Sequence, residues 1–225
     1  MLRPVSRRCG VFGALRNLST TPKRAERPDD VLSHDDYFDV SSLFTKRELM
    51  DAGVHLGHKA GAWNPLMKPY ILGERLGIHV VDLDQTANHL RRALNVIGHV
   101  AHRRGVILFV HGRPEYAQLT QQTARDAGEY FATGDWKPGT LTNSHKLLST
   151  ARLPDLAIFF STKTDQTALR ETVMCNIPTI GIIDTDCNPN LITYTIPGND
   201  DTPSSIRLFC SLFRDAILRG KEKDQ

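Results

Sequence analysis

Several features that mark common protein classes are missing from the sequence. Its 4 cysteines form no CxxC pair and show no regular spacing, so neither a disulfide framework nor a zinc ribbon is indicated. The longest apolar runs, VILFV and LAIFF, fall far short of the roughly 18 residues that a membrane span needs. With 225 residues and 40% apolar content, the chain can bury one substantial core. We expect one main domain in a reducing compartment, with no membrane contact.

Glycine-rich loops that bind phosphate groups are missing as well. Neither GxGxxG nor GxxxxGK[ST] occurs, and the hydrolase motifs GxSxG and HExxH are absent. The segment DTDCNPN, residues 184–190, begins like a calcium loop but has Pro189 where that loop needs glycine. Asp184 and Asp186 still follow an apolar segment, where α/β enzymes place their ligands. An enzyme that uses these two residues with a metal ion, or as acid and base, is therefore the main alternative to a binding protein.

Acidic residues are scarce in the first 27 residues, which contain 7 Arg and Lys residues against the single acid Glu26, giving a charge of +6. Subtracting these from the totals of 28 and 25 leaves 21 basic and 24 acidic residues, or −3, in the rest of the chain. A basic, Ser-containing segment without an apolar stretch is typical of a mitochondrial transit peptide. The alternative is an uncleaved basic arm on a cytosolic interaction protein. Because the body is slightly acidic, any contact with nucleic acid must be local.

Apolar segments alternate with amphipathic segments through most of the chain. VILFV, LAIFFS and TIGIID have the character of buried strands, and helices are expected over residues 84–102, up to residue 126, and over residues 165–175. This alternation predicts a three-layer α/β fold, with a mostly parallel sheet and helices on both faces, similar to a Rossmann-like or flavodoxin-like layer. No internal repeat interrupts the pattern.

The two ends of this pattern have signals of their own. Thr45 and Glu48 form the expected capping box of a short helix that Gly53 ends, and the segments YIL and IHVV after it suggest a hairpin that leads into a buried strand. At the other end, Thr202 can cap a closing helix that has Pro203 at its first position. The buried stripe of that helix is expected to consist of Ile206, Phe209, Cys210, Phe213 and Ile217.

The stretch HLGHKAGAWNP, residues 55–65, concentrates side chains that can carry chemistry. Two histidines three residues apart suggest zinc, but no further Cys or Asp ligands follow at a recognisable spacing. Imidazoles, cations and the flat face of a tryptophan can instead contact RNA phosphates and exposed bases. We therefore predict an RNA-facing patch that consists of His55, His58, Lys59, Trp63, Asn64 and Lys68. In the alternative reading, the tryptophan belongs to the core and the histidines cap local turns.

The turn PGNDD contains Pro197, Gly198, Asn199 and Asp200, followed by a second aspartate. Side chains of adjacent acids diverge in a turn, so they are poorly placed for paired acid and base catalysis. Turn residues followed by acids suit the beginning of a helix, through capping and the helix dipole. We expect this turn to fix the last helix rather than to contact RNA.

One ordered series of motifs runs from about residue 43 to residue 220. It consists of AGVHLGHKAGAWNPLMKPYILGERLGIHVVDLDQT, GVILFVHGRPE, GTLTN, RLPDLAIFF, NIPTIGIIDTDCNPNLITYTIPGNDD and SIRLFCSLFRDAIL. In this order the motifs closely resemble the S-two family of small-subunit ribosomal proteins. Together with the basic N-terminus, they resemble the mitochondrial members of that family.

The resemblance implies a structural component of the small ribosomal subunit in the mitochondrial matrix, with no catalytic residues, cofactor or metal. It further implies binding to small-subunit rRNA and to neighbouring ribosomal proteins, with the S-one-type protein as a candidate neighbour, and no homo-oligomer. Gly139, Thr140 and Asn143 of GTLTN become a second group of RNA-binding candidates. The organisation is then a transit peptide (1–27), an extended segment (28–42), the α/β domain (43–220) and a charged tail (221–225).

The chain departs from the family pattern in three places. Bacterial relatives have a long helical hairpin between the segments that match GTLTN and LPD, whereas here only SHKLLSTAR, residues 144–152, connects them. Basic residues are replaced by Ala60-Gly61-Ala62 before the tryptophan, and the Arg-Trp-Leu-Gly pattern appears as Asp135-Trp136-Lys137-Pro138. We therefore expect protein neighbours to carry more of the attachment than in bacteria.

Overall fold

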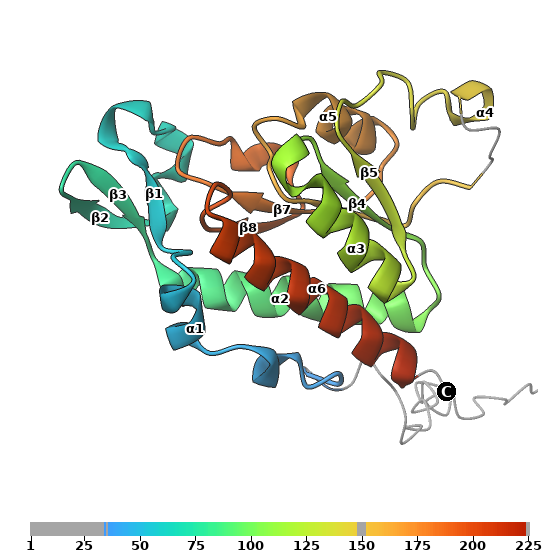
Figure 1. Ribbon diagram of the computed structural model, residues 1–225, viewed down its shortest axis with the longest axis horizontal. Coiled ribbons are helices and arrows are strands. Elements are labelled where there is room, and N and C mark those ends of the chain that lie inside the picture. The colour runs from blue at the N-terminus through green and yellow to red at the C-terminus, as the bar shows by residue number, and fades with distance from the viewer. Residues whose placement is uncertain (1–33, 35, 148–151, 224–225) are drawn as a thin grey trace, which may run out of the picture. The chain divides into compact units, whose positions relative to one another are not determined.

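The computed structural model describes residue 34, residues 36–147 and residues 152–223 (Figure 1). The chain divides into two units, Met1–Asp35 and Asp36–Gln225, and all helices and strands described below belong to the second. The predicted transit peptide, residues 1–27, therefore lies outside the described residues.

The central sheet has five parallel strands in the order β5-β4-β6-β7-β8. They are β4 (Ile107–His111), β5 (Tyr130–Thr133), β6 (Leu156–Phe159), β7 (Thr179–Ile183) and β8 (Tyr194–Pro197). β6 and β7 are buried at every position, which explains their uninterrupted apolar sequences. The predicted parallel sheet is confirmed. The sequence reasoning missed β5 and β8, because these edge strands of four residues are partly exposed and lack a continuous apolar run.

Helices cover both faces of this sheet, as predicted. α2 and α6 lie side by side across one face together with α3, and α5 lies on the other face (Figure 1). Their bounds are α2 (Leu83–His102), α3 (Ala117–Ala127), α5 (Gln166–Met174) and α6 (Pro203–Glu222). Two short helices, α1 (Lys46–Asp51) and α4 (Ser144–Leu147), and the 3₁₀ turns η4 (Pro114–Tyr116) and η5 (Pro189–Leu191) complete the body. Among the described residues, no helix is both long and apolar enough to cross a membrane.

The packing between α2 and α6 is tight enough to need glycine. The apolar residues that recur every three or four positions along α2 are all buried, and so is the predicted stripe of α6; those of α2 are Ala87, Leu90, Leu94, Ile97 and Ala101. A Cβ atom on Gly220 of α6 would lie 2.5 Å from the carbonyl oxygen of Gly98 in α2. The two backbones therefore touch, and any side chain at position 220 would force the helices apart.

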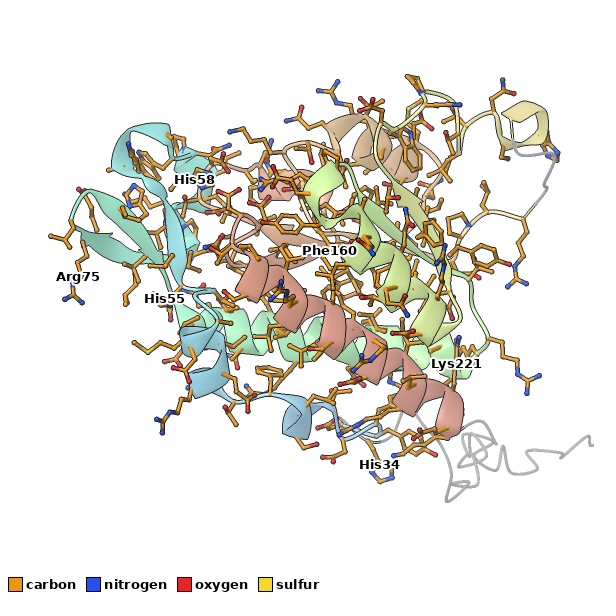
Figure 2. All side chains as sticks on the ribbon, viewed as in Figure 1. His34, His55, His58, Arg75, Phe160 and Lys221 are labelled. Carbon is orange, nitrogen blue, oxygen red and sulfur yellow. The ribbon has the colours of Figure 1, made fainter. Side chains whose placement is uncertain are left out.

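Aromatic rings join α6 to the sheet. The ring of Phe160 lies 6.0 Å from that of Phe109 in β4 and 5.7 Å from that of Phe213 in α6, measured between centroids. Figure 2 shows Phe160 between the sheet and the helices. The α5 side has a separate core that includes Val110, Phe159 and Leu169. Alternate residues of each strand thus supply the two hydrophobic layers.

A smaller antiparallel sheet stands beside the body, with the strand order β1-β3-β2 (Figure 1). It consists of β1 (Leu56–Lys59), β2 (Ile71–Arg75) and β3 (Ile78–Val81), with the 3₁₀ turns η2 (Ala60–Ala62) and η3 (Pro65–Tyr70) between β1 and β2. The predicted hairpin is confirmed. The expectation that it leads into a buried strand is wrong, because only Val81 of β3 is buried.

The segment before α1 packs on the two long helices. Phe38 is 1% exposed, and a Cβ on Gly98 would lie 2.8 Å from its ring. Arg219 of α6 pairs with Asp39 at 3.6 Å. The 3₁₀ turn η1 (Val40–Leu43) then leads to the N-cap of α1, where the predicted capping box between Thr45 and Glu48 is confirmed. Buried aromatic groups, rather than regular hydrogen bonding, hold this lead-in.

Candidate functional site

In open parallel sheets, ligands bind outside the carboxyl ends of the strands, where neighbouring connections run in opposite directions. Here that crevice lies between β4 and β6, since the chain runs from β4 outward to β5 and returns to β6. The side chain of Asp165 fills it: its Oδ2 accepts a hydrogen bond from Gly112 N at 3.0 Å. A Cβ on Gly112 would lie 2.2 Å from Asp165 Oδ1, so the two segments are in contact. Burial raises the pKa of Asp165 to about 6.

His58, which belongs to β1 of the small sheet, contacts the loops at the same edge of the parallel sheet. Nδ1 of its ring lies 3.2 Å from Asp184 Oδ1, and Nε2 lies 3.2 Å from Asp201 Oδ2 and 3.6 Å from Asp186 Oδ2. Its backbone N–H donates to Thr185 Oγ1 at 2.9 Å. Figure 2 shows His58 on the side of β1 that faces the sheet loops. The small sheet is therefore attached to the body through an imidazole surrounded by carboxylates.

These carboxylates determine the charge of the ring. The paired carboxylate of Asp184 raises the pKa of His58 to about 9, Asp186 and Asp201 add to the effect, and partial burial opposes it. The ring is consequently an imidazolium ion at neutral pH. Both of its nitrogens then carry protons, and its contacts with the three carboxylates are ion pairs.

Two further cations complete the cluster. Arg113, which follows β4, pairs with Asp201 and lies 3.4 Å from Asp200 Oδ1. Lys163, which follows β6, lies 2.5 Å from Asp186 Oδ2. Burial raises the pKa of Asp200 to about 6 although Arg113 acts against this. Loops after four parallel strands are thus joined by a network of ion pairs, which we call the edge cluster: His58, Arg113, Lys163, Asp184, Asp186, Asp200 and Asp201.

The edge cluster has part of the geometry of a cation site. His58, Asp184 and Asp201 each offer one ligand atom, and these atoms lie within 4.8 Å of one another. An imidazole must be neutral to bind a metal ion, whereas the neighbouring carboxylates favour the protonated ring. As arranged here, the residues form a network in which His58 itself supplies the positive charge between the acids.

The predicted RNA-facing residues near β1 separate into two groups. His58 points to the edge cluster, and Asn64 donates its backbone N–H to Thr185 O at 2.8 Å while its side chain caps η3. Lys59 and Lys68 are exposed, and Trp63 is partly buried. His55 lies half-buried just before β1, where its carbonyl oxygen accepts a hydrogen bond from Val81 N at 2.9 Å.

Trp63 and Lys68 line a shallow hollow of about 200 Å³ on the small sheet, together with Ile71, Gly73, Glu74 and His79. The rings of Trp63 and His79 lie 5.5 Å apart between centroids. Both ring nitrogens of His79 are buried and have no hydrogen-bond partner among the described residues. Sequence reasoning missed His79, although its place in the alternating segment IHVV put it on one face of a strand.

The second predicted group lies on the α5 side, in the loop before α4. Gly139, with φ +90°, donates its N–H to Glu171 Oε1 at 2.6 Å, and Thr140 Oγ1 donates to Lys137 O at 2.6 Å. Asn143 is exposed. This loop is therefore held by Glu171, a buried acid of α5 that the sequence reasoning missed. A charged residue next to the buried stripe of α5 was the available signal.

The turn Pro197-Gly198-Asn199-Asp200 joins three parts of the molecule. Pro197 O accepts from Thr86 Oγ1 at 2.8 Å, and Gly198 N donates to Ile183 O at 2.9 Å. Asn199 Oδ1 accepts from the N–H groups of Asp201 at 2.8 Å and Thr202 at 3.1 Å, at the beginning of α6. Thr202 occupies the N-cap position, but its side chain makes no capping bond, since its Oγ1 accepts from Asn199 Nδ2. Thr202 thus has the predicted N-cap position, but the predicted side-chain cap is wrong, and Asn199 instead holds the two residues that precede α6.

The fold and this edge define a class of protein: an open parallel α/β body whose usual ligand crevice is filled by its own charged side chains. Comparison with known families is more specific. The family model of ribosomal protein S2 matches residues 49–152 and 145–220. The chain therefore belongs to the ribosomal protein S2 family.

Individual relatives agree. The chain is 50% identical over 197 residues to the small ribosomal subunit protein uS2m of Bos taurus, covering 85% of this chain and 67% of the relative. It is 37% identical over 222 residues to the small ribosomal subunit protein uS2 of Rickettsia typhi, covering 79% of this chain and 75% of the relative. Since 79% of 225 residues is about 178, roughly 44 of those 222 aligned positions have no residue in this chain. This agrees with the missing helical hairpin, and only α4 lies between β5 and β6 among the described residues.

Proposed function

We propose that this chain is a structural component of the small subunit of the mitochondrial ribosome and binds small-subunit rRNA and neighbouring ribosomal proteins. The observation that carries the proposal is the identity of 50% to the bovine protein named uS2m across 85% of the chain. The basic segment of residues 1–27 supports delivery to the matrix as a cleaved presequence. Mapping the N-terminus of the mature protein tests that part separately.

A role without catalysis agrees with the filled crevice. Asp165, Arg113 and His58 occupy the edge of the sheet at which an α/β enzyme would hold its substrate. Asp184, the first candidate of the enzyme alternative, is 1% exposed and paired with His58. Its carboxylate therefore supports the fold instead of facing a substrate.

The RNA interface is proposed on the outer surface of the small sheet and on the loop before α4. Lys59 and Lys68 supply positive charge there, and the hollow beside Trp63 offers an aromatic surface for an unstacked base. His58 joins the small sheet to the body through its ion pairs in the edge cluster. Gly139, Thr140 and Asn143 form the second contact region. Neighbouring proteins, the S-one-type protein among the candidates, supply the remaining attachment.

Sedimentation of mitochondrial lysate with detection of this chain tests the assignment. We expect the chain in the small-subunit peak at both low and moderate salt. Its absence from that peak at both concentrations would overturn the proposal.

Two variants of a tagged chain test the interface. Trp63→Ala should weaken attachment to the subunit by about 1–3 kcal/mol, the stacking energy of one base, with unchanged thermal stability of the free protein. Tyr130→Ala, an equally simple truncation of an exposed aromatic on β5 far from the small sheet, is the control. Equal retention of both variants at every salt concentration would exclude the hollow from the interface.

A further inference from the structure

A small pocket of about 150 Å³ lies beside the edge cluster, next to α5. Asn64 comes to it from the small sheet, Thr162 and Lys163 from the loop after β6, Arg170 from α5, and Asn188 from the loop after β7. It is a different site from the filled crevice, which lies between β4 and β6. Four parts of the fold meet here around open space.

The charge of this pocket is positive, although residues 28–225 carry −3. Its cations are Lys163 and Arg170, and its one acid is Asp186. Lys163 lies 2.5 Å from Asp186, and its hydrogen bond lowers the pKa of that carboxyl group although burial acts in the opposite direction. Arg170 is exposed and forms no ion pair within the part of the chain that the structure describes. The net charge of the lining is therefore about that of one unpaired arginine.

Hydrogen-bond donors dominate the rest of the lining. The Oδ1 atoms of Asn64 and Asn188 each accept a backbone N–H, at 3.0 Å in both cases, which leaves the Nδ2 groups as donors. The first residue of α5, Gln166, also lines the pocket. Among the described residues, the side chain of the N-cap residue Asp165 makes no capping bond to this helix.

One residue in the wall of the pocket has a buried hydroxyl group. Thr162 is 4% exposed and lines the pocket, yet its Oγ1 has no hydrogen-bond partner among the described residues other than the weak thiol of Cys187. A buried hydroxyl without a full partner costs about 1–3 kcal/mol.

Size and chemistry together select the class of ligand. Sites for whole cofactors or drug-sized molecules have volumes of about 300–1,000 Å³, so this pocket admits only a single small group. Cations, amide donors and the N-terminus of a helix match a phosphate group, which needs donors on several sides. We propose that this pocket binds one phosphate of the RNA backbone, with Arg170 and Lys163 as its cations.

The proposal rests on the proposed function, and the position of Asn64 links the two. Asn64 follows Trp63 directly, so a single strand of RNA that stacks a base on Trp63 can place a phosphate in the pocket. The pocket thus continues the proposed interface from the small sheet toward α5. It also supplies a local phosphate contact of the kind that a slightly acidic body requires.

Subunits from cells that make one tagged variant as their only copy provide the test. Arg170→Glu and the milder Arg170→Gln remove the unpaired cation, and Arg207→Glu on α6 is the control, because Arg207 is exposed on the opposite face of the sheet. Retention on the subunit is measured against salt concentration. We expect the Arg170 variants to dissociate three- to tenfold more readily at low salt, with a slope smaller by about one unit, while Arg207→Glu behaves as the wild type.

A photo-crosslinking residue in place of Gln166 identifies what occupies the pocket. A crosslink to rRNA supports the proposal, and a crosslink to protein alone overturns it. Thermal melting of the purified chain with inorganic phosphate distinguishes a site for free phosphate from a site for an RNA phosphate. If phosphate stabilises the chain, Arg170→Gln abolishes this stabilisation and no RNA crosslink forms in subunits, then the pocket binds free phosphate and the RNA assignment is overturned. Identical salt profiles for the Arg170 and Arg207 variants overturn the phosphate site while the proposed function stands. Absence of the wild-type chain from the subunit overturns both.

Discussion

The attachment of the small sheet through His58 leads to a prediction about pH. His58→Gln removes the imidazolium that separates Asp184, Asp186 and Asp201 but keeps a polar side chain of similar length. The exposed residue His145, for which the same substitution leaves the edge cluster intact, provides the control His145→Gln.

The magnitude follows from the pKa of His58, which rises from 6.5 to about 9 on folding. A shift of this size corresponds to about 3 kcal/mol, and since 26% of the side chain is exposed, screening by solvent reduces the expected contribution to about 1–2 kcal/mol. Because the folded protein holds the proton more tightly, this stabilisation is complete below pH 6.5 and is lost as the pH rises through 9.

Urea unfolding of the purified chain measures the effect. At pH 6, His58→Gln should lower the free energy of unfolding by about 1–2 kcal/mol relative to the wild type, and at pH 9.5 the difference should fall below about 0.5 kcal/mol. His145→Gln should match the wild type at both values. A loss of equal size at pH 6 and pH 9.5 would refute the electrostatic reasoning, since it would mean that His58 acts through its shape alone.

Three further predictions concern stability. Burial lowers the pKa of His111 to about 4, so at low pH the unfolded chain takes up a proton that the folded chain excludes. As the pH falls from 6.5 to 4, the free energy of unfolding of the wild type should therefore drop by about 3 kcal/mol relative to that of His111→Gln, measured by denaturant unfolding. Parallel pH profiles of the two proteins would contradict this. Gly220→Val should lower the free energy of unfolding by about 1–3 kcal/mol because its Cβ meets a backbone oxygen of α2, whereas Gly61→Val, which meets nothing within 4 Å, should change little. Asn199→Ala should lower the free energy of unfolding by about 1–3 kcal/mol because two hydrogen bonds at the beginning of α6 are lost. A melting temperature equal to that of the wild type would show that these hydrogen bonds do not stabilise the fold.

The sequence predicted the elements whose signals are local. The stripe of α2 repeats every three or four residues over 20 residues, and the capping box at Thr45 needs only four residues to be recognised. β5, β8 and β1 were missed because they are partly exposed and lack a continuous apolar run. Their hydrogen bonds depend on sheet order, which no local pattern encodes.

The site was predictable in its residue types but not in its contacts. The two histidines and the tryptophan of HLGHKAGAWNP identified a concentration of chemistry, while the partners of His58 lie more than 120 positions later, after β7 and β8. Thr185, which accepts the His58 N–H, is 127 residues away. Only the return of successive parallel strands to one edge brings these groups together, so charge pairing across the edge cluster could not be deduced from spacing.

The packing of the lead-in against α6 has a consequence for the order in which the molecule can be completed. Phe38 and Asp39 meet Arg219 across 180 positions of the chain, near opposite ends of the described fold. A ribosome making this protein, or a membrane pore passing it N-terminus first, releases one side of that contact long before the other. The Phe38 ring can already pack on Gly98 of α2, but Arg219 reaches the carbonyl oxygens of Phe38 and Asp39 only after the last helix emerges. Completion of the fold thus waits for α6, the last helix that the structure describes.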